Sequence, residues 1–132
     1  MASLLVTTGP NKGDYYPLET KTHVIGRVAE ASVQLVDDRI SRQHCQIKYD
    51  WDTNTHVITD MGSRNGTEVI REGADPMKVA SDAVPLHEGD KISVAGVEVR
   101  FTTEDFADKE SAAKHAHLKR WFGEEFRNTM GM

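Results

Sequence analysis

The sequence predicts a single all-β sandwich domain followed by one helix. Over residues 3–102, short apolar segments recur about every 8–12 residues with turn residues between them. No segment in this range has the apolar spacing of an amphipathic helix, which argues against a sheet built from βαβ units. The spacing becomes helical only after Phe101. A chain of 132 residues is long enough to bury one hydrophobic core.

The expected strands are short and end at turn signals. They cover residues 4–8, 15–18, 23–25, 33–35, 45–49, 56–59, 67–70, 91–94 and 97–101. Gly9 and Pro10 end the first strand, because glycine and proline favour turns. Pro17 marks the second as an edge strand, since proline has no N–H to donate to a central ladder.

The later strands are expected to pair as hairpins. Residues 45–49 alternate small or apolar side chains with polar ones, which is typical of a strand with one buried face. Residues 50–54 form a hairpin loop that returns into 56–59. Ala95-Gly96 separates the last two strands and predicts a tight turn.

The segment after the last strand is expected to be helical over about residues 104–128. Thr102 and Asp105 have the spacing of a capping box. One face of about 140° collects the apolar residues Ala107, Leu118, Trp121, Phe122 and Phe126. We therefore divide the chain into a domain at 1–103 and a C-terminal amphipathic helix and tail at 104–132. The apolar stripe packs on the sandwich, or it forms an interface with another chain or with a further part of a larger protein.

Composition excludes several classes of protein. The net charge of −5 and the pI near 5.6 argue against a general nucleic-acid binder, so any anion must be held by a local cluster of arginines. The apolar runs are far shorter than the ~20 residues of a membrane span, and the N-terminus lacks the pattern of a signal peptide. The single cysteine permits no internal disulfide and no cysteine-based zinc site. We expect a cytoplasmic protein without a cofactor.

Four segments at strand ends or in loops carry the residues typical of a binding site. They are residues 26–27, 39–44, 60–67 and 86–92. Loops at one end of a sandwich cluster in space and can build a site on a rigid scaffold. A phosphate monoester needs guanidinium groups for bidentate contact and hydroxyl groups to complete its shell. Arg27, Ser41, Arg42 and Arg64 supply these groups, so we expect them to bind phosphate.

The order of these motifs resembles the forkhead-associated (FHA) domain family. G-R at 26–27 is followed by S-x-x-H at 41–44, by G-S-x-N-G-T at 62–67 and by L-x-x-G-D-x-I-x-V at 86–94. The resemblance covers residues 3–102. It implies a sandwich of about eleven strands that binds phosphothreonine peptides through its apical loops.

The resemblance also implies roles for individual residues. Arg27 and Ser41 resemble the phosphate-binding arginine and hydroxyl of the family, and Arg42 resembles the neighbour that often joins them. Asn65 resembles the residue that hydrogen-bonds the peptide backbone beside the phosphothreonine. Together with the glycine after it, Asn65 is also a type I′ turn signal. Arg39 matches the position that often senses the side chain three residues after the phosphothreonine.

Three further residues resemble the framework of the loops, and two features depart from the family. Gly26, His44 and Gly66 are the framework positions. Arg64 stands where the family often has threonine or serine, and could still reach a phosphate or an acidic peptide residue. The segment 71–83 is longer than the brief turn common in the family, and is either a mobile loop near the peptide or a small extra hairpin.

The function implied is a phosphothreonine-dependent signalling adaptor whose partner is a threonine-phosphorylated protein. The alternative keeps the fold but makes the protein a phospho-independent scaffold or a homodimer, through a sandwich face or the C-terminal helix. Oligomeric state, pathway and partner sequence are not encoded in any motif.

An enzyme is the least favoured reading. Ser41 and His44 are close in sequence, but a catalytic dyad also needs a third orienting group and an oxyanion hole. A phosphatase would need a cysteine nucleophile in a phosphate cradle or a carboxylate cluster for metals, and neither pattern is present. His115 and His117 face different sides of the expected helix, which argues against a metal site.

Overall fold

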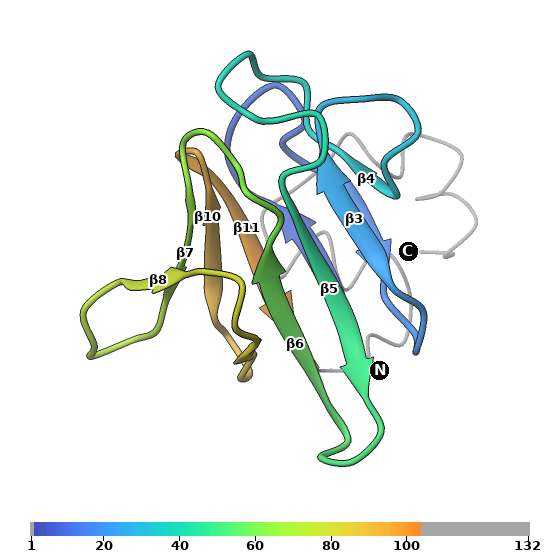
Figure 1. Cartoon of the computed structure of the whole chain (residues 1–132), viewed down its shortest axis with the longest axis vertical. Helices are drawn as coiled ribbons and strands as arrows, with labels where there is room; N and C mark the ends of the chain where they lie inside the picture. The colour runs from blue at the N-terminus through green and yellow to red at the C-terminus, as the bar shows by residue number, and fades with distance from the viewer. Residues whose placement is uncertain (1, 104–132) are drawn as a thin grey trace, which may run out of the picture.

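The computed structural model describes residues 2–103, which form a sandwich of two sheets (Figure 1). The described residues contain eleven strands and no helix, which confirms the all-β prediction. The expected helix at 104–128 lies outside the described residues. Thr102 itself ends the last strand, and its hydroxyl donates a hydrogen bond to Glu88 Oε2 at 2.7 Å.

The larger sheet has six strands and the smaller sheet has five. In spatial order the larger sheet contains β2 (Tyr15–Pro17), β1 (Ser3–Val6), β11 (Val97–Thr102), β10 (Lys91–Val94), β7 (Thr67–Ile70) and β8 (Met77–Val79). The smaller sheet contains β4 (Val33–Gln34), β3 (His23–Gly26), β5 (Cys45–Asp50), β6 (Thr55–Asp60) and β9 (Val84–Pro85). All neighbouring strands are antiparallel except β3 and β4, which are parallel.

Alternating side chains from both sheets fill the space between them. In β5, Cys45 and Ile47 are buried whereas Lys48 is exposed, which is the period-2 pattern expected from the sequence. Phe101 of β11 and Ile92 of β10 face the same core from the larger sheet and are buried. Each such side chain contributes about 1.5–3 kcal/mol through burial, so the core fixes the strand ends that carry the loops.

The segment 71–83 proves to be the return of a hairpin. Its strand β8 pairs with β7 in the larger sheet, after which the chain crosses to the smaller sheet, where β9 pairs with β6. Strand β9 could not be predicted from the sequence, because its two residues, Val84 and Pro85, are too few to show a period. Pro17 lies in β2 at the edge of its sheet, as predicted.

The two predicted tight turns, at Ala95-Gly96 and Asn65-Gly66, differ in their backbone φ angles. Ala95 and Gly96 both have positive φ, 50° and 93°, as the predicted two-residue hairpin turn requires. At the second predicted turn, Gly66 has a φ of 85° but Asn65 does not have a positive φ. The type I′ assignment for that dipeptide is therefore wrong, since this turn needs positive φ at both central residues.

Three of the four polar segments meet at one end of the sandwich. In Figure 1, the loops after β3, β4 and β6 and the β10–β11 turn lie at the upper end, whereas the β5–β6 hairpin lies at the lower end. The fourth segment, 86–92, leads into the end of β10 that is remote from the β10–β11 turn. Grouping it with the other three was wrong, because a strand separates it from them.

Candidate functional site

A pocket of about 230 Å³ opens between the loops at the upper end of the sandwich. Four arginines, one serine and one carboxylate line it, namely Arg27, Arg39, Arg42, Arg64, Ser41 and Asp38. The structure thus brings together all four residues expected to bind phosphate. Asn65 and Gly66 line an adjacent hollow of about 510 Å³, which shares Arg39 with the first. Gly26 and His44 are buried behind the loops.

Arg27 follows β3 and is held against the β4–β5 loop. Its backbone N–H donates to the Ser41 carbonyl at 3.1 Å, and its Nε donates to the Ile40 carbonyl at 3.0 Å. Only Nε is used in this way, so both terminal nitrogens are unpaired among the described residues. An arginine fixed at Nε and exposed at its tip is preorganised to meet an anion with two parallel hydrogen bonds.

Gly26 allows the close approach that this arrangement needs. A Cβ atom at Gly26 would lie 1.9 Å from the carbonyl oxygen of Arg42 and 2.8 Å from its carbonyl carbon. These are backbone atoms, which cannot rotate away as a side chain can. The end of β3 and the segment carrying Ser41 therefore lie closer together than any residue with a side chain would permit.

Ser41 links two loops through its hydroxyl. The Oγ atom accepts a hydrogen bond from the Arg64 backbone N–H at 3.0 Å. Because the oxygen serves as acceptor there, the hydroxyl proton remains available as a donor to a ligand in the pocket. Arg42 and Arg64 line the same pocket as Ser41, and both are exposed.

The buried side chain of His44 joins the same two loops through two hydrogen bonds. Its Nδ1 accepts a hydrogen bond from the Ser41 backbone N–H at 3.0 Å, so the ring proton belongs on Nε2. Nε2 then donates to the Gly66 carbonyl at 2.8 Å. The side chain has no exposed surface. With both ring nitrogens occupied by backbone groups, His44 has no nitrogen left to act as a base on Ser41.

Asp60 organises the β6–β7 loop, a role that was not predicted from the sequence. Its Oδ2 accepts the N–H groups of Gly62 and Ser63 at 2.9 and 2.8 Å. Its Oδ1 accepts the hydroxyls of Ser63 and Thr67, each at 2.7 Å. Burial alone would raise the pKa of Asp60, but these four hydrogen bonds together hold the pKa below its ordinary value. The sequence signal was an aspartate two residues before a glycine, which is typical of an Asx turn.

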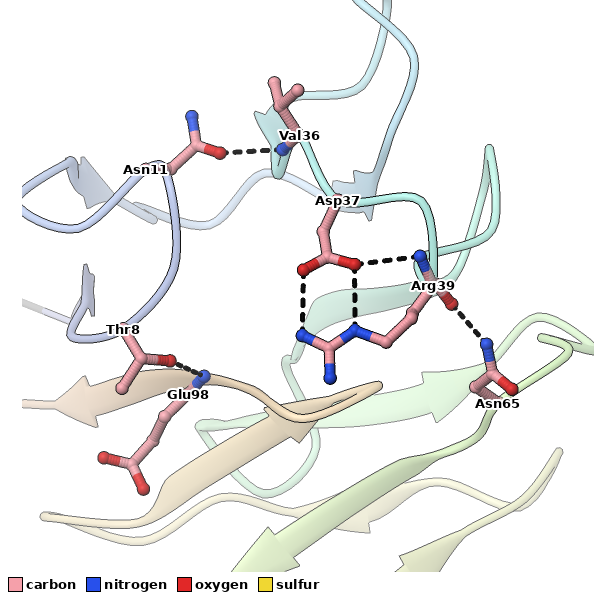
Figure 2. A network of polar contacts seen from close by, with 7 residues as sticks. All are labelled: Thr8, Asn11, Val36, Asp37, Arg39, Asn65 and Glu98. Atoms are coloured by element: carbon pink, nitrogen blue, oxygen red, sulfur yellow. Dashed lines mark hydrogen bonds and ion pairs between the residues drawn. The ribbon is translucent and has the colours of Figure 1, made fainter.

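Asn65 bridges from the β6–β7 loop to the β4–β5 loop. Its Nδ2 donates to the Arg39 carbonyl at 2.6 Å (Figure 2). The side chain is exposed and lines the larger hollow. Its amide retains a second N–H and its carbonyl oxygen for contact with a ligand.

The Arg39 guanidinium is paired with Asp37, a partner that was not predicted from the sequence. Figure 2 shows its guanidinium facing the carboxylate of Asp37. Nε donates to Oδ1 at 3.0 Å and Nη2 donates to Oδ2 at 2.9 Å, while the Arg39 backbone N–H also donates to Oδ1 at 2.8 Å. These contacts lower the pKa of Asp37 to about 2, first through the guanidinium and then through the backbone N–H.

Residues 2–103 contain neither a metal-binding cluster nor a membrane-spanning helix. No group of three or more histidine, cysteine or acidic side chains is placed to hold a metal ion there. Over the same residues there is also no helix of the length and apolarity that a membrane span requires.

The comparisons identify the family. A sequence model described as FHA domain matches residues 23–95, and this chain belongs to that family. The curated relative named oxoglutarate dehydrogenase inhibitor, from Corynebacterium jeikeium, is 32% identical over 93 residues, which are 70% of this chain and 58% of that protein.

Solved structures show the same fold. A domain from a structural and functional analysis of phosphothreonine-dependent FHA domain interactions is 25% identical, with a TM-score of 0.63 and coverage of 80% of this chain and 98% of that one. EmbR of Mycobacterium tuberculosis, solved in complex with a low-affinity phosphopeptide, is 30% identical, with a TM-score of 0.64 and coverage of 80% and 25%. FHA domains are interaction modules, and the relative is named as an inhibitor rather than an enzyme.

Proposed function

We propose that this chain is a phosphothreonine-dependent interaction domain of a signalling adaptor, with the upper pocket as its phosphate site. One observation carries the proposal, namely that Arg27, Arg42 and Arg64 converge with the Ser41 hydroxyl on one exposed pocket. Three separate loops deliver these groups, and hydrogen bonds between the loops hold them in place before any ligand arrives.

The charge of the pocket suits a phosphate dianion. Arg39 is neutralised by Asp37, which leaves three arginines against the single carboxylate of Asp38. The remaining balance of two positive charges matches the −1.5 to −2 of a phosphothreonine at about pH 7. A net charge of −5 over the whole chain does not oppose this, because exposed charges are screened over about 8 Å.

Each group has a distinct task in the proposed complex. The terminal nitrogens of Arg27 bind two phosphate oxygens, and the Ser41 hydroxyl donates to one of them. Arg42 and Arg64 add charge from the rim. Asn65 binds the peptide backbone with its carbonyl oxygen and its second amide proton. Three or four charge-assisted bonds of about 1.5–3 kcal/mol each, less the cost of ordering the peptide, correspond to micromolar affinity.

The same proposal covers the rest of the molecule. The proposed phosphopeptide-binding domain comprises residues 1–103, and the protein acts in the cytoplasm without enzymatic activity of its own. The partner is a protein phosphorylated on threonine. The curated relative resembles this chain over part of its length only, so its partners are not carried over.

A titration against an oriented phosphothreonine peptide library tests the proposal. The best peptide is then compared with its unphosphorylated form, and we expect at least tenfold weaker binding without the phosphate. Arg27→Ala should lower the affinity to a similar degree, whereas Arg27→Lys should retain part of it, because one charge remains without the bidentate geometry.

Lys48→Ala is the matched control for charge. Lys48 is an exposed cation on β5 and lies outside the pocket, so its removal changes the net charge equally. It should leave phosphopeptide affinity within about twofold. Equal affinity for the phosphorylated and unphosphorylated peptides would reject the proposal in favour of a phospho-independent scaffold.

A further inference from the structure

Arg39 stands between the phosphate pocket and the larger hollow beside it. The larger hollow lies beyond Arg39 and Asn65, and its other walls come from β7, β8 and β10 and from the β10–β11 turn. A peptide that is anchored in the first pocket and runs past Asn65 therefore meets Arg39 and this hollow next. By the family resemblance, Arg39 is the position expected to contact the third residue after the phosphothreonine.

The Asp37 carboxylate binds the guanidinium of Arg39, which would otherwise be free to bind an acidic side chain of the peptide. The two side chains form a parallel pair of hydrogen bonds, at 3.0 and 2.9 Å, which is the strongest geometry available to an arginine and a carboxylate. The pair is also local, since only one residue separates its members, so little chain ordering is needed to form it. The Asp37 side chain is only 16% exposed, compared with 60% for Arg39.

The guanidinium nitrogen of Arg39 that does not bind Asp37 points away from that carboxylate. In Figure 2 the third nitrogen of the guanidinium points toward the strands that carry the β10–β11 turn. A Cβ atom at Gly96 would lie 3.1 Å from this nitrogen, Nη1. Arg39 therefore presents an N–H donor at the wall of the larger hollow, but its charge is already balanced.

The remaining charges of the larger hollow are balanced as well. Glu68 on β7 and Lys78 on β8 both line it, and they are cross-strand partners in the sheet. Both are exposed. No cation in this hollow is therefore in excess, in contrast to the phosphate pocket.

We infer that Asp37 determines peptide specificity, by removing the preference for an acidic side chain three residues after the phosphothreonine that Arg39 would otherwise confer. The inference rests on the proposed function, because it concerns the residues that follow an anchored phosphothreonine. A second carboxylate near Arg39 meets the repulsion of Asp37 together with the attraction of the guanidinium, and the two nearly cancel. The hollow then takes an uncharged side chain, whose carbonyl, amide or hydroxyl oxygen accepts from Nη1 when it is polar.

The test uses phosphothreonine peptides in one alanine-rich background that differ only at the third position after the phosphothreonine. Aspartate, leucine and alanine are compared there by calorimetry. The native protein should bind the aspartate peptide no more tightly than the alanine peptide. Asp37→Asn should bind the aspartate peptide about fivefold more tightly than the alanine peptide, the gain expected for an exposed ion pair.

Two further variants assign the effect to Arg39. Adding Arg39→Gln to Asp37→Asn should abolish the acquired preference. Arg39→Gln alone should weaken the aspartate peptide relative to the alanine peptide, because the repulsion of Asp37 is then no longer balanced. Asp38→Asn is the matched control. It removes the same charge at the next residue, whose side chain lines the phosphate pocket. It should strengthen all three phosphopeptides equally, without changing their ratio.

The outcomes separate this inference from the proposed function. If the native protein binds the peptides only when they are phosphorylated, and Asp37→Asn leaves the aspartate-to-alanine ratio unchanged, the inference fails while the proposed function stands. A native preference for the aspartate peptide also overturns the inference. Binding that ignores phosphorylation in every variant refutes the proposed function, and the inference with it.

Discussion

Replacing His44 with alanine tests whether the phosphate pocket depends on a buried fastening beneath it. The imidazole has no exposed surface and bonds the backbone of two loops, at Ser41 N and Gly66 O. Its removal leaves one donor and one acceptor without their partner and opens a cavity. At about 1–3 kcal/mol for each unsatisfied group, partly relieved by entering water, we expect the free energy of unfolding to fall by about 2–4 kcal/mol.

Phosphopeptide affinity should fall with it, even in the fraction that remains folded. Ser41 and the loop that carries Arg64 lose their common support, so the pocket must be ordered at the expense of binding energy. Urea denaturation gives the stability, and titration well below the unfolding midpoint gives the affinity. We expect a loss of at least tenfold in affinity.

His56→Ala is the control for stability alone. His56 is also buried, bonds the Glu19 carbonyl at 2.8 Å and contacts the rings of Tyr49 and Phe101. It lies near the β5–β6 hairpin at the other end of the sandwich. This variant should be destabilised to a similar degree but bind phosphopeptide normally when folded. Native affinity in folded His44→Ala would refute the reasoning.

Three more outcomes follow from the packing. Gly26→Ala should abolish phosphopeptide binding and lower stability by about 1–3 kcal/mol, since its Cβ would lie 1.9 Å from a backbone oxygen; unaltered binding in a titration would contradict this. Asp60 has a lowered pKa in the folded state, so the stability it contributes is present above its unfolded pKa of about 3.8 and is lost as the pH falls through the folded value. Denaturation midpoints from pH 7 to pH 3 should therefore fall more steeply for the native protein than for Asp60→Asn, and parallel curves would count against this. The Cys45 thiol is buried, which raises its pKa to about 12, so it should react with a thiol reagent only on unfolding; rapid labelling of the native protein would disagree.

Much of the fold was readable because its signals are local. Period-2 alternation in β5 and the edge position of Pro17 each depend on a few adjacent residues, and the structure confirms both. The Ala95-Gly96 turn is also a local signal, and the positive φ angles of both residues confirm it. By contrast, β9 has two residues and depends for its existence on β6 beside it, so nothing within its own sequence could predict it.

The residues around the phosphate pocket were named from the sequence, but their mutual arrangement was not. Motif order singled out Arg27 and Ser41. Side-chain chemistry added Arg42 and Arg64, because guanidinium groups suit a phosphate whatever their geometry. The same order also wrongly grouped 86–92 with them, since sequence spacing does not say at which end of a strand a loop emerges.

The fold class, the family resemblance and the candidate anion-binding side chains could be predicted from the sequence, because alternation, turn residues and motif order are properties of neighbouring residues. That Asp37 neutralises Arg39, that His44 joins two loops and that Asp60 shapes one of them became visible only in the folded molecule. These contacts depend on where side chains point and on which loops meet. Both are fixed by packing of the two sheets between residues distant in the chain, and no local pattern carries that information.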